Sequence, residues 1–114
     1  MKVIIVEKLM RQKVRLGDSD VNHIVESFKQ HFGKDDHLWL FGSRVDLERQ
    51  GGDIDLYIET QLPSVEAAAK ETKFFVNLWR RMGEQKIDVV LHVLSESKKL
   101  PIYEVAKVKG VQLV

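Results

Sequence analysis

The sequence predicts an α/β (α+β) domain in which a small mixed β-sheet packs against helices. Short apolar stretches of strand length occur at residues 38–41, 53–59 and 87–94. They alternate with two longer stretches, at about 19–32 and 63–82, whose apolar residues recur at helical spacing. With 114 residues, the chain has room for one core but not for a second, substrate-binding lobe.

The composition narrows the classes of function. Lys and Arg number 18 and Asp and Glu number 17, so the formal net charge is +1 and gives no strong signal for nucleic-acid binding. The chain has no Cys, which excludes disulfides and thiolate metal sites and fits a reducing cytoplasm. No apolar run approaches the length of a membrane span. We therefore expect a cytoplasmic protein without a membrane segment.

The first fifteen residues are the hardest to interpret. Residues 1–15 follow neither the strand period nor the helical period, and we interpret them as an N-terminal leader or an edge strand. A translation start at Met10 is a third interpretation. The single folded domain is predicted to span residues 16–114.

A helix is predicted over residues 19–32. Asp18-Ser19-Asp20 is typical of an N-cap cluster, apolar residues then recur at spacings of three and four, and Gly33 stands at the position of a C-terminal glycine. The helix is expected to lay its apolar face on the sheet. His23 and His31 are interpreted as solvent-facing or rim residues rather than ligands.

The strand at 38–41 leads into a Gly-Ser turn. It is apolar on both faces, which is typical of a strand that has neighbours on each side. Gly42 lets the backbone approach a ligand closely, and Ser43 adds a hydroxyl and a backbone N–H at a strand-to-helix turn. Arg44 is placed either to meet the charge of a triphosphate or to form a surface salt bridge with the acidic residues that follow it.

Two carboxylates one residue apart mark the next strand. Asp53 and Asp55 point to one face because strand side chains alternate, whereas Ile54, Leu56 and Ile58 point to the other. Two negative charges this close repel each other unless a cation lies between them, and Mg²⁺ is the usual oxygen-bound ion. We therefore predict a metal site here. The alternative is an edge strand with a solvated acidic face.

The following helix is predicted to be structural. It begins at Pro63-Ser64 and ends at Gly83, with Phe75, Trp79 and Met82 on one apolar side. A base-stacking role for Trp79 is the alternative, but aromatic residues at helical spacing more often belong to the core.

The strand at 87–94 supplies a third carboxylate. Asp88 lies near the start of an apolar strand, where a buried charge needs a metal or hydrogen-bond donors. We interpret it as a third metal ligand, with an Asp held by a backbone N–H or by Lys86 as the alternative. His92 lies on the same face and is a candidate for a pocket wall.

The C-terminal segment is predicted to contain a short helix and an apolar tail. Pro101 starts the helix, which runs to about Val108, and Gly110 ends it. The tail at residues 111–114 is expected to dock on the domain or on a partner.

One combination of residues is characteristic of a known group of enzymes. Gly42-Ser43, nine residues and Asp53-Ile54-Asp55, with apolar flanks, resemble the signature of the DNA polymerase beta-like nucleotidyltransferase superfamily and of its minimal nucleotidyltransferase (MNT) family. The segment 86–91 is similar to the strand that carries the third carboxylate of that family. The resemblance covers most of residues 14–110 and implies a polymerase beta-like palm fold. The chain departs from the commoner pattern after Arg44, where it reads Val-Asp-Leu-Glu-Arg instead of a small, Gly-containing loop.

The resemblance also implies a reaction. It is the transfer of NMP, taken as AMP from ATP, to a hydroxyl with release of pyrophosphate. Asp53, Asp55 and Asp88 would hold two Mg²⁺ ions, for which Mn²⁺ is a substitute. The Gly42-Ser43-Arg44 turn would bind the triphosphate of the nucleotide.

The acceptor is inferred from the same resemblance. Many MNT proteins pair with a small helical HEPN-domain protein as the antitoxins of toxin–antitoxin modules, and can adenylylate that partner. A protein acceptor is therefore implied, which fits a chain without room for an acceptor domain. Two alternatives stay open. One is a non-catalytic nucleotide-binding antitoxin or regulatory subunit that acts by contact, and the other is a homodimeric small-molecule nucleotidyltransferase.

Overall fold

The computed structural model describes residues 16–45 and 52–114. Its elements are α2 (Asp18–His31), β1 (His37–Phe41), the 3-10 turn η1 (Gly42–Val45), β2 (Ile54–Thr60), α3 (Ser64–Met82), β3 (Ile87–Val93), α4 (Pro101–Lys109) and β4 (Val111–Gln112). These elements confirm the predicted α/β class and agree closely with the predicted segments. Residues 1–15, interpreted as a leader or an edge strand, lie outside the described residues. In the Val-Asp-Leu-Glu-Arg segment that departs from the MNT pattern, only Val45 is described.

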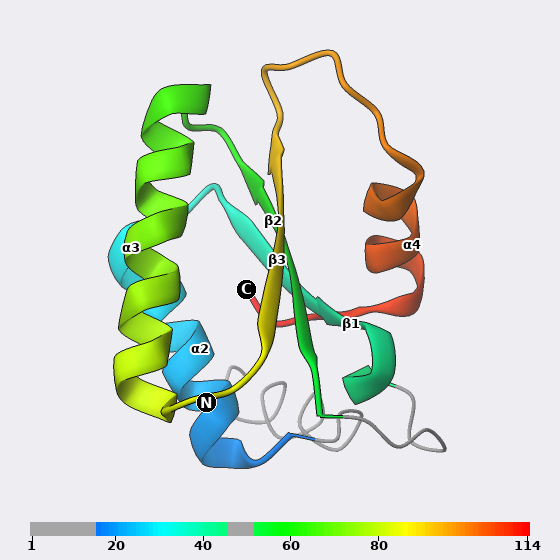
Figure 1. Ribbon diagram of the computed structural model, residues 1–114. Helices are drawn as coiled ribbons and strands as arrows, with labels where there is room; N and C mark the ends of the chain where they lie inside the picture. Colours follow the sequence, from blue (N-terminus) through cyan, green and yellow to red (C-terminus); the bar gives the residue numbers. More distant parts are fainter. Residues whose placement is uncertain (1–15, 46–51) are drawn as a thin grey trace, which may run out of the picture.

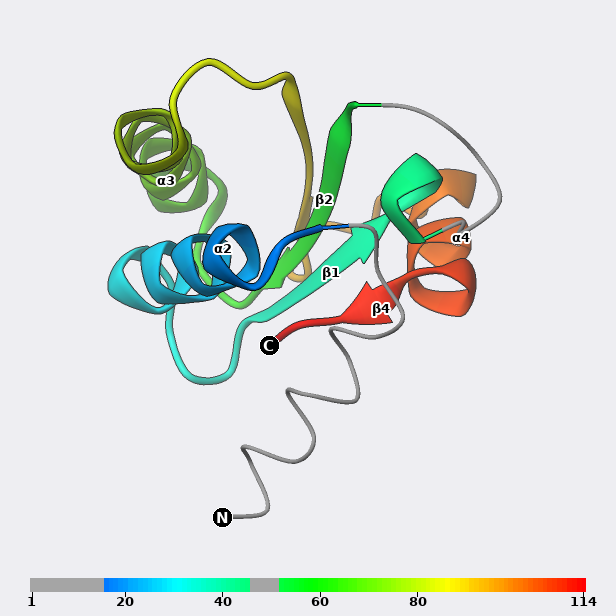
Figure 2. The same cartoon turned by 90° about the horizontal axis from the view of Figure 1, so that it is seen from below.

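The four strands form one mixed sheet in the order β3-β2-β1-β4. β2 runs antiparallel to β1 and parallel to β3, and β4 runs antiparallel to β1. The parallel pair is joined by the crossover helix α3, because parallel strands cannot be joined by a tight turn. Figure 1 shows α2 and α3 on one face of the sheet and α4 on the other, and Figure 2 shows the same layers from below.

The larger core lies between the sheet and helices α2 and α3. Ile54, Leu56 and Ile58 of β2 are fully buried in it, as the strand alternation predicted. Phe28 of α2 is also fully buried, and its ring stacks on that of Phe32 with 4.9 Å between the centroids. The predicted docking of this helix on the sheet is therefore confirmed.

A smaller core lies between the sheet and α4. It consists of Trp39 and Tyr57 from the sheet and Tyr103 and Ala106 from the helix. The ring centroids of Trp39 and Tyr57 are 5.3 Å apart, and those of Tyr57 and Tyr103 are 5.6 Å apart. The face of β2 that carries the carboxylates is thus acidic near the start of the strand and aromatic further along.

The apolar side predicted for α3 was wrong by one position. Phe74 and Leu78 are fully buried, whereas Phe75 is 37% exposed and Trp79 is 52% exposed. Of the predicted residues, Met82 does pack against the core. The two pairs, 74 with 78 and 75 with 79, have the same helical spacing, so periodicity alone does not distinguish them.

Both predicted ends of α2 also differ from the structure. The N-cap residue is Gly17, without a side-chain hydrogen bond, while Asp18 and Asp20 lie inside the first turn, where negative charge favours the helix dipole. Gly33 lacks the positive φ of a C-terminal glycine. Its N–H instead donates to Oδ2 of the buried Asp36 at 2.8 Å. The C-cap residue is Phe32, whose N–H donates to the carbonyl of Phe28.

The C-terminal tail docks on the domain itself. Residues of β4 pair with Trp39 and Leu40 of β1, and the backbone N–H of Leu38 donates to the carbonyl of Val114 at 3.1 Å. Val114 also packs against the larger core. The tail was predicted to dock on the domain or on a partner, and in the structure it packs on the domain.

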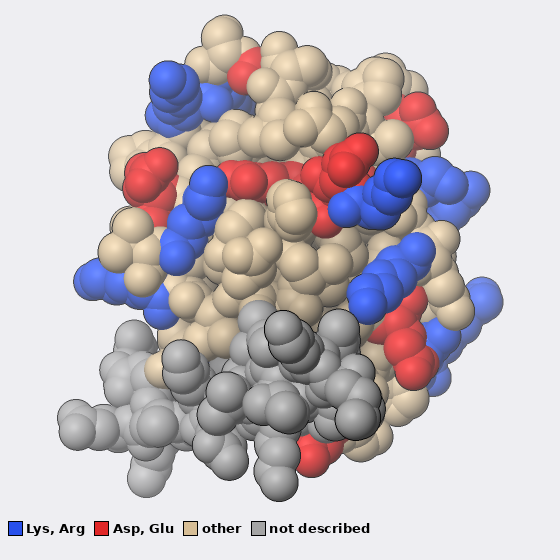
Figure 3. Space-filling view, turned by 180° about the vertical axis from the view of Figure 1, so that it is seen from behind, with Lys and Arg blue, Asp and Glu red and all other residues tan. Residues whose placement is uncertain are grey.

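The charged side chains on the surface are mixed in sign. On the face seen in Figure 3, acidic side chains run across the upper middle and basic side chains flank them. This mixture agrees with the formal net charge of +1. Over the described part of the chain, no helix has both the length and the apolar character that a membrane span requires.

Candidate functional site

The predicted site residues gather where β1 ends and where β2 and β3 begin (Figure 1). Phe41 at the end of β1 pairs with Asp55, and Asp55 pairs with Asp88 across the parallel strands. One residue earlier, Ile54 pairs with Ile87, and both are buried. Because strand side chains alternate, burial of these two isoleucines turns both Asp side chains to the opposite face. The structure therefore brings Asp55 and Asp88 side by side.

Gly42 lies directly against Asp55. Its φ is +76°, a backbone conformation that residues with a side chain rarely adopt. A Cβ built on Gly42 would overlap Oδ2 of Asp55 and would lie 3.2 Å from its Cγ. Glycine is therefore needed here for two reasons, the backbone conformation and the space that the carboxylate fills.

The carboxylate of Asp55 is destabilised in its charged form. Partial burial raises its pKa above the ordinary value, and the negative charges of Asp88 and Asp53 raise it further. The ammonium of Lys86 acts in the opposite sense, and a hydrogen bond with Asp88 adds to the increase. A bound proton or a bound cation would relieve this repulsion.

Asp53 precedes β2 and lies at the surface. Its Oδ2 is 3.4 Å from Nζ of Lys86, and the two side chains are 49% and 68% exposed. An exposed ion pair of this kind contributes up to about 1 kcal/mol. As placed, residues 16–45 and 52–114 contain no group of three or more His, Asp or Glu side chains that could hold a metal ion. The three predicted ligands are thus arranged as the Asp55–Asp88 pair and a separate ion pair between Asp53 and Lys86.

The donors at this site suit a divalent cation in their chemistry. Carboxylate oxygens are the hard ligands that Mg²⁺ prefers. A cation beside Asp55 and Asp88 would also remove the like-charge repulsion that raises the pKa of Asp55.

Ser43 and Arg44 lie in η1. Nη2 of Arg44 donates to the carbonyl oxygen of Gly52 at 3.0 Å, which ties the start of the loop to its end. Neither acidic residue considered as a salt-bridge partner for Arg44, Asp46 or Glu48, lies within the described residues. Arg44 therefore links η1 to Gly52, the residue before Asp53.

A second group of polar residues lies on the same sheet face. His92, expected to form a pocket wall, does line a cavity, although one further along the strands than the carboxylates. Sequence reasoning missed Tyr57 and Glu59, which line this cavity with it and which continue the alternation of Asp53 and Asp55 along β2. That alternation was the available signal.

Comparison with known proteins assigns no family. No model of a protein family matches the chain, and no curated protein matches it. The chemistry of the site is therefore inferred from its own residues.

Proposed function

We propose that the chain is a metal-dependent nucleotidyltransferase that transfers NMP, taken as AMP from ATP, to an acceptor hydroxyl. The observation that carries this proposal is the Asp55–Asp88 pair, which is held in register across parallel strands and packed against Gly42. Hard oxygen ligands beside a turn with accessible backbone suit a metal-bound triphosphate. The resemblance to the MNT signature supports the same function, with a polymerase beta-like palm as the fold.

The carboxylates would hold the metal. Asp53, Asp55 and Asp88 are the proposed ligands for Mg²⁺ or Mn²⁺, and the bound metal would activate the acceptor hydroxyl and neutralise the phosphate charge. The contribution of the chain is positioning. Pairing of β2 with β3 fixes Asp55 relative to Asp88, and pairing of β1 with β2 fixes Gly42 relative to Asp55.

The turn after β1 would bind the phosphates. Gly42 has no side chain to keep a phosphate away, and Ser43 follows it with a hydroxyl and a backbone N–H. The guanidinium of Arg44 has five N–H donors, so it can keep its contact with Gly52 and still meet an anion.

The proposed acceptor is a hydroxyl on a partner protein. The MNT resemblance points to a small helical HEPN-type toxin, with this chain as its antitoxin. Surface residues of α3 support a protein partner, because Phe75, Val76 and Trp79 share one helix face and are 37%, 41% and 52% exposed. Exposed apolar side chains that cluster in this way are typical of interaction sites.

The test is a transfer reaction with α-labelled ATP and Mg²⁺. The purified chain is incubated with and without the protein encoded by the neighbouring gene, and both protein-bound label and released pyrophosphate are followed. We expect label on the partner, loss of that label with Asp55→Asn, and retention with Asp35→Asn, a matched change at an exposed position outside the site. Undiminished transfer by Asp55→Asn would exclude the proposed metal role.

A nucleotide-binding subunit without transferase activity is the second candidate. The ion pair between Asp53 and Lys86 at 3.4 Å favours it, because the ammonium already neutralises one of the three carboxylates without a metal. Such a protein would bind ATP and its partner in the same experiment but would transfer no label. Label on an added small molecule, in the absence of any partner protein, would instead indicate a homodimeric small-molecule enzyme.

A further inference from the structure

A cavity of about 460 Å³ lies between α4 and the C-terminal halves of β2 and β3. This volume is within the usual range for small-molecule sites, roughly 300–1,000 Å³. Aromatic rings form one part of its wall and aliphatic side chains another; these residues are Tyr57, His92, Tyr103, Leu94, Leu100 and Pro101. An apolar wall with a few converging polar groups is typical of a ligand site.

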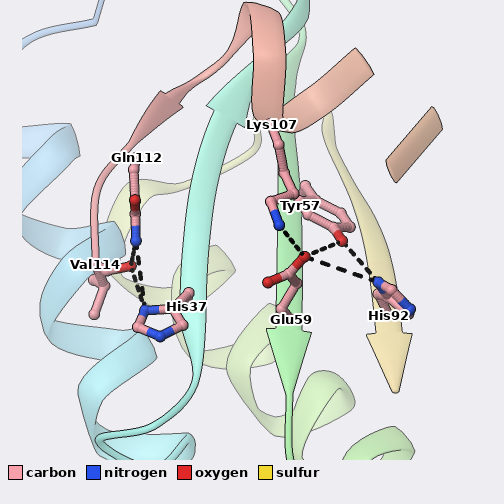
Figure 4. A network of polar contacts seen from close by, with 7 residues as sticks. All are labelled: His37, Tyr57, Glu59, His92, Lys107, Gln112 and Val114. Carbon is pink, nitrogen blue, oxygen red and sulfur yellow. Dashed lines mark hydrogen bonds and ion pairs between the residues drawn. The ribbon is translucent and has the colours of Figure 1, made fainter. Parts of the chain in front are cut away.

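The polar groups of the cavity form one network, shown in Figure 4. The hydroxyl of Tyr57 lies 2.7 Å from Oε2 of Glu59 and 2.8 Å from Nδ1 of His92. Nζ of Lys107 lies 3.1 Å from the same oxygen of Glu59. The side chains of Glu59 and His92 are only 11% and 15% exposed, so water competes little for these contacts.

This network fixes the tautomer of His92. The ion pair with Lys107 requires an ionised Glu59, which only accepts hydrogen bonds, so the Tyr57 hydroxyl donates its single hydrogen to Glu59. The hydroxyl oxygen can then only accept from His92, which places a hydrogen on Nδ1. In the neutral imidazole, Nε2 is therefore a hydrogen-bond acceptor. It lies on the side of the ring away from Tyr57 (Figure 4).

The orientation of the His92 ring is fixed as well. The ring stacks on Tyr103 with 3.9 Å between the centroids and an interplanar angle of 12°. One nitrogen is thus hydrogen-bonded and one face is covered. Among the contacts made by described residues, none uses Nε2, so an oriented acceptor remains at an aromatic wall.

The charges around the cavity are balanced. Glu59 and Glu104 are matched in number by Lys99 and Lys107, so the lining has no net charge when His92 is neutral. An uncharged ligand therefore suits this cavity better than a phosphate or an ammonium compound.

We propose that the cavity binds a small, uncharged, planar heterocycle that carries an amino group. The ring packs against the aromatic and aliphatic walls, and the amino group donates a hydrogen bond to Nε2 of His92. The cavity residues Glu59 and His92 lie four positions further along their strands than Asp55 and Asp88. Binding therefore needs neither the metal nor the transfer reaction proposed for the carboxylates.

Adenine and purine are matched probes for this site, because adenine adds one exocyclic amino group to the same ring system. In buffer without Mg²⁺, we expect the wild-type chain to bind adenine about tenfold more tightly than purine, which is the effect of one net hydrogen bond. Calorimetric titration or NMR shift titration measures both affinities. The comparison uses the wild-type chain alone, so it does not depend on the folding of any variant.

Two variants assign the preference to His92. His92→Phe keeps a ring beside Tyr103 but removes the acceptor, so the preference for adenine should fall below about twofold while purine affinity is retained. His23→Phe, on α2 and across the sheet from the cavity, should keep the tenfold preference. Equal affinity of the wild-type chain for the two probes, binding of neither probe, or a preference that persists in His92→Phe would each overturn the proposal.

Discussion

Replacing Gly42 by Ala is predicted to disturb the carboxylate site directly. At a φ of +76° an L-residue costs about 1–2 kcal/mol relative to the ordinary backbone conformation. The new Cβ would also overlap Oδ2 of Asp55, and overpacking of this kind costs about 1–3 kcal/mol. We therefore expect Gly42→Ala to lower the free energy of unfolding by about 2–5 kcal/mol.

A double-mutant cycle separates these two contributions. In an Asp55→Ala background the overlap is absent, so Gly42→Ala should cost only the backbone term of about 1–2 kcal/mol. Gly83→Ala is the control, because Gly83 has a similar φ of +78° but no heavy atom within 4 Å of a Cβ built on it. Its cost should be the same in both backgrounds.

Urea denaturation at pH 7 measures all of these free energies. The midpoint reports stability, and an unchanged slope shows that the variants unfold from a similarly compact state. Equal costs of Gly42→Ala with and without the Asp55 carboxylate would refute the close contact between Gly42 and Asp55.

Three further predictions concern pH, the core and the polar network. Because the pKa of Asp55 is higher in the folded chain than its ordinary value of 3.8, the folded state binds more protons between these two values, and stability falls as the pH rises through that range. Asp55→Asn should therefore raise the thermal unfolding midpoint at pH 7, with no gain below the ordinary carboxyl pKa; an equal gain at every pH would contradict the charge repulsion. Phe74→Ala should cost about 3–5 kcal/mol and Phe75→Ala less than about 1 kcal/mol in urea denaturation, because only Phe74 is fully buried, and a reversed order would contradict the assignment of the buried face of α3. Tyr57→Phe should cost about 1–3 kcal/mol in the same assay, because the loss of its hydroxyl removes the hydrogen bonds to Glu59 and His92 and leaves Nδ1 of the partly buried His92 without a partner, and a neutral effect would count against the network.

The strands and helices were predictable because each is marked by a local pattern. In β2 the alternation of apolar residues assigned Ile54, Leu56 and Ile58 to the core, and they are fully buried. Pro101 and Gly110 bounded the last helix as expected. In each case the information lies within a few neighbouring residues.

Features that depend on contacts distant in sequence were not predictable in the same way. Whether Phe74 or Phe75 is buried depends on how α3 is rotated about its axis against the sheet. Residues 111–112 form the strand β4 through their pairing with β1, which is distant in sequence. The carboxylate pair was predictable in its residues but not in its geometry, because the register that places Asp55 opposite Asp88 is set by two strands joined through a long helix. Lys107 lacks any local signal that connects it with Glu59.

The central claim is that the Asp55–Asp88 pair supports binding of a metal-bound nucleotide. Isothermal titration of ATP into the purified chain, with and without Mg²⁺, tests it most directly, using Asp55→Asn and the control Asp35→Asn. We predict binding that depends on Mg²⁺ in the wild-type chain and in Asp35→Asn, and loss of that dependence in Asp55→Asn. ATP binding that is the same with and without Mg²⁺, or that Asp55→Asn leaves unchanged, would contradict the claim.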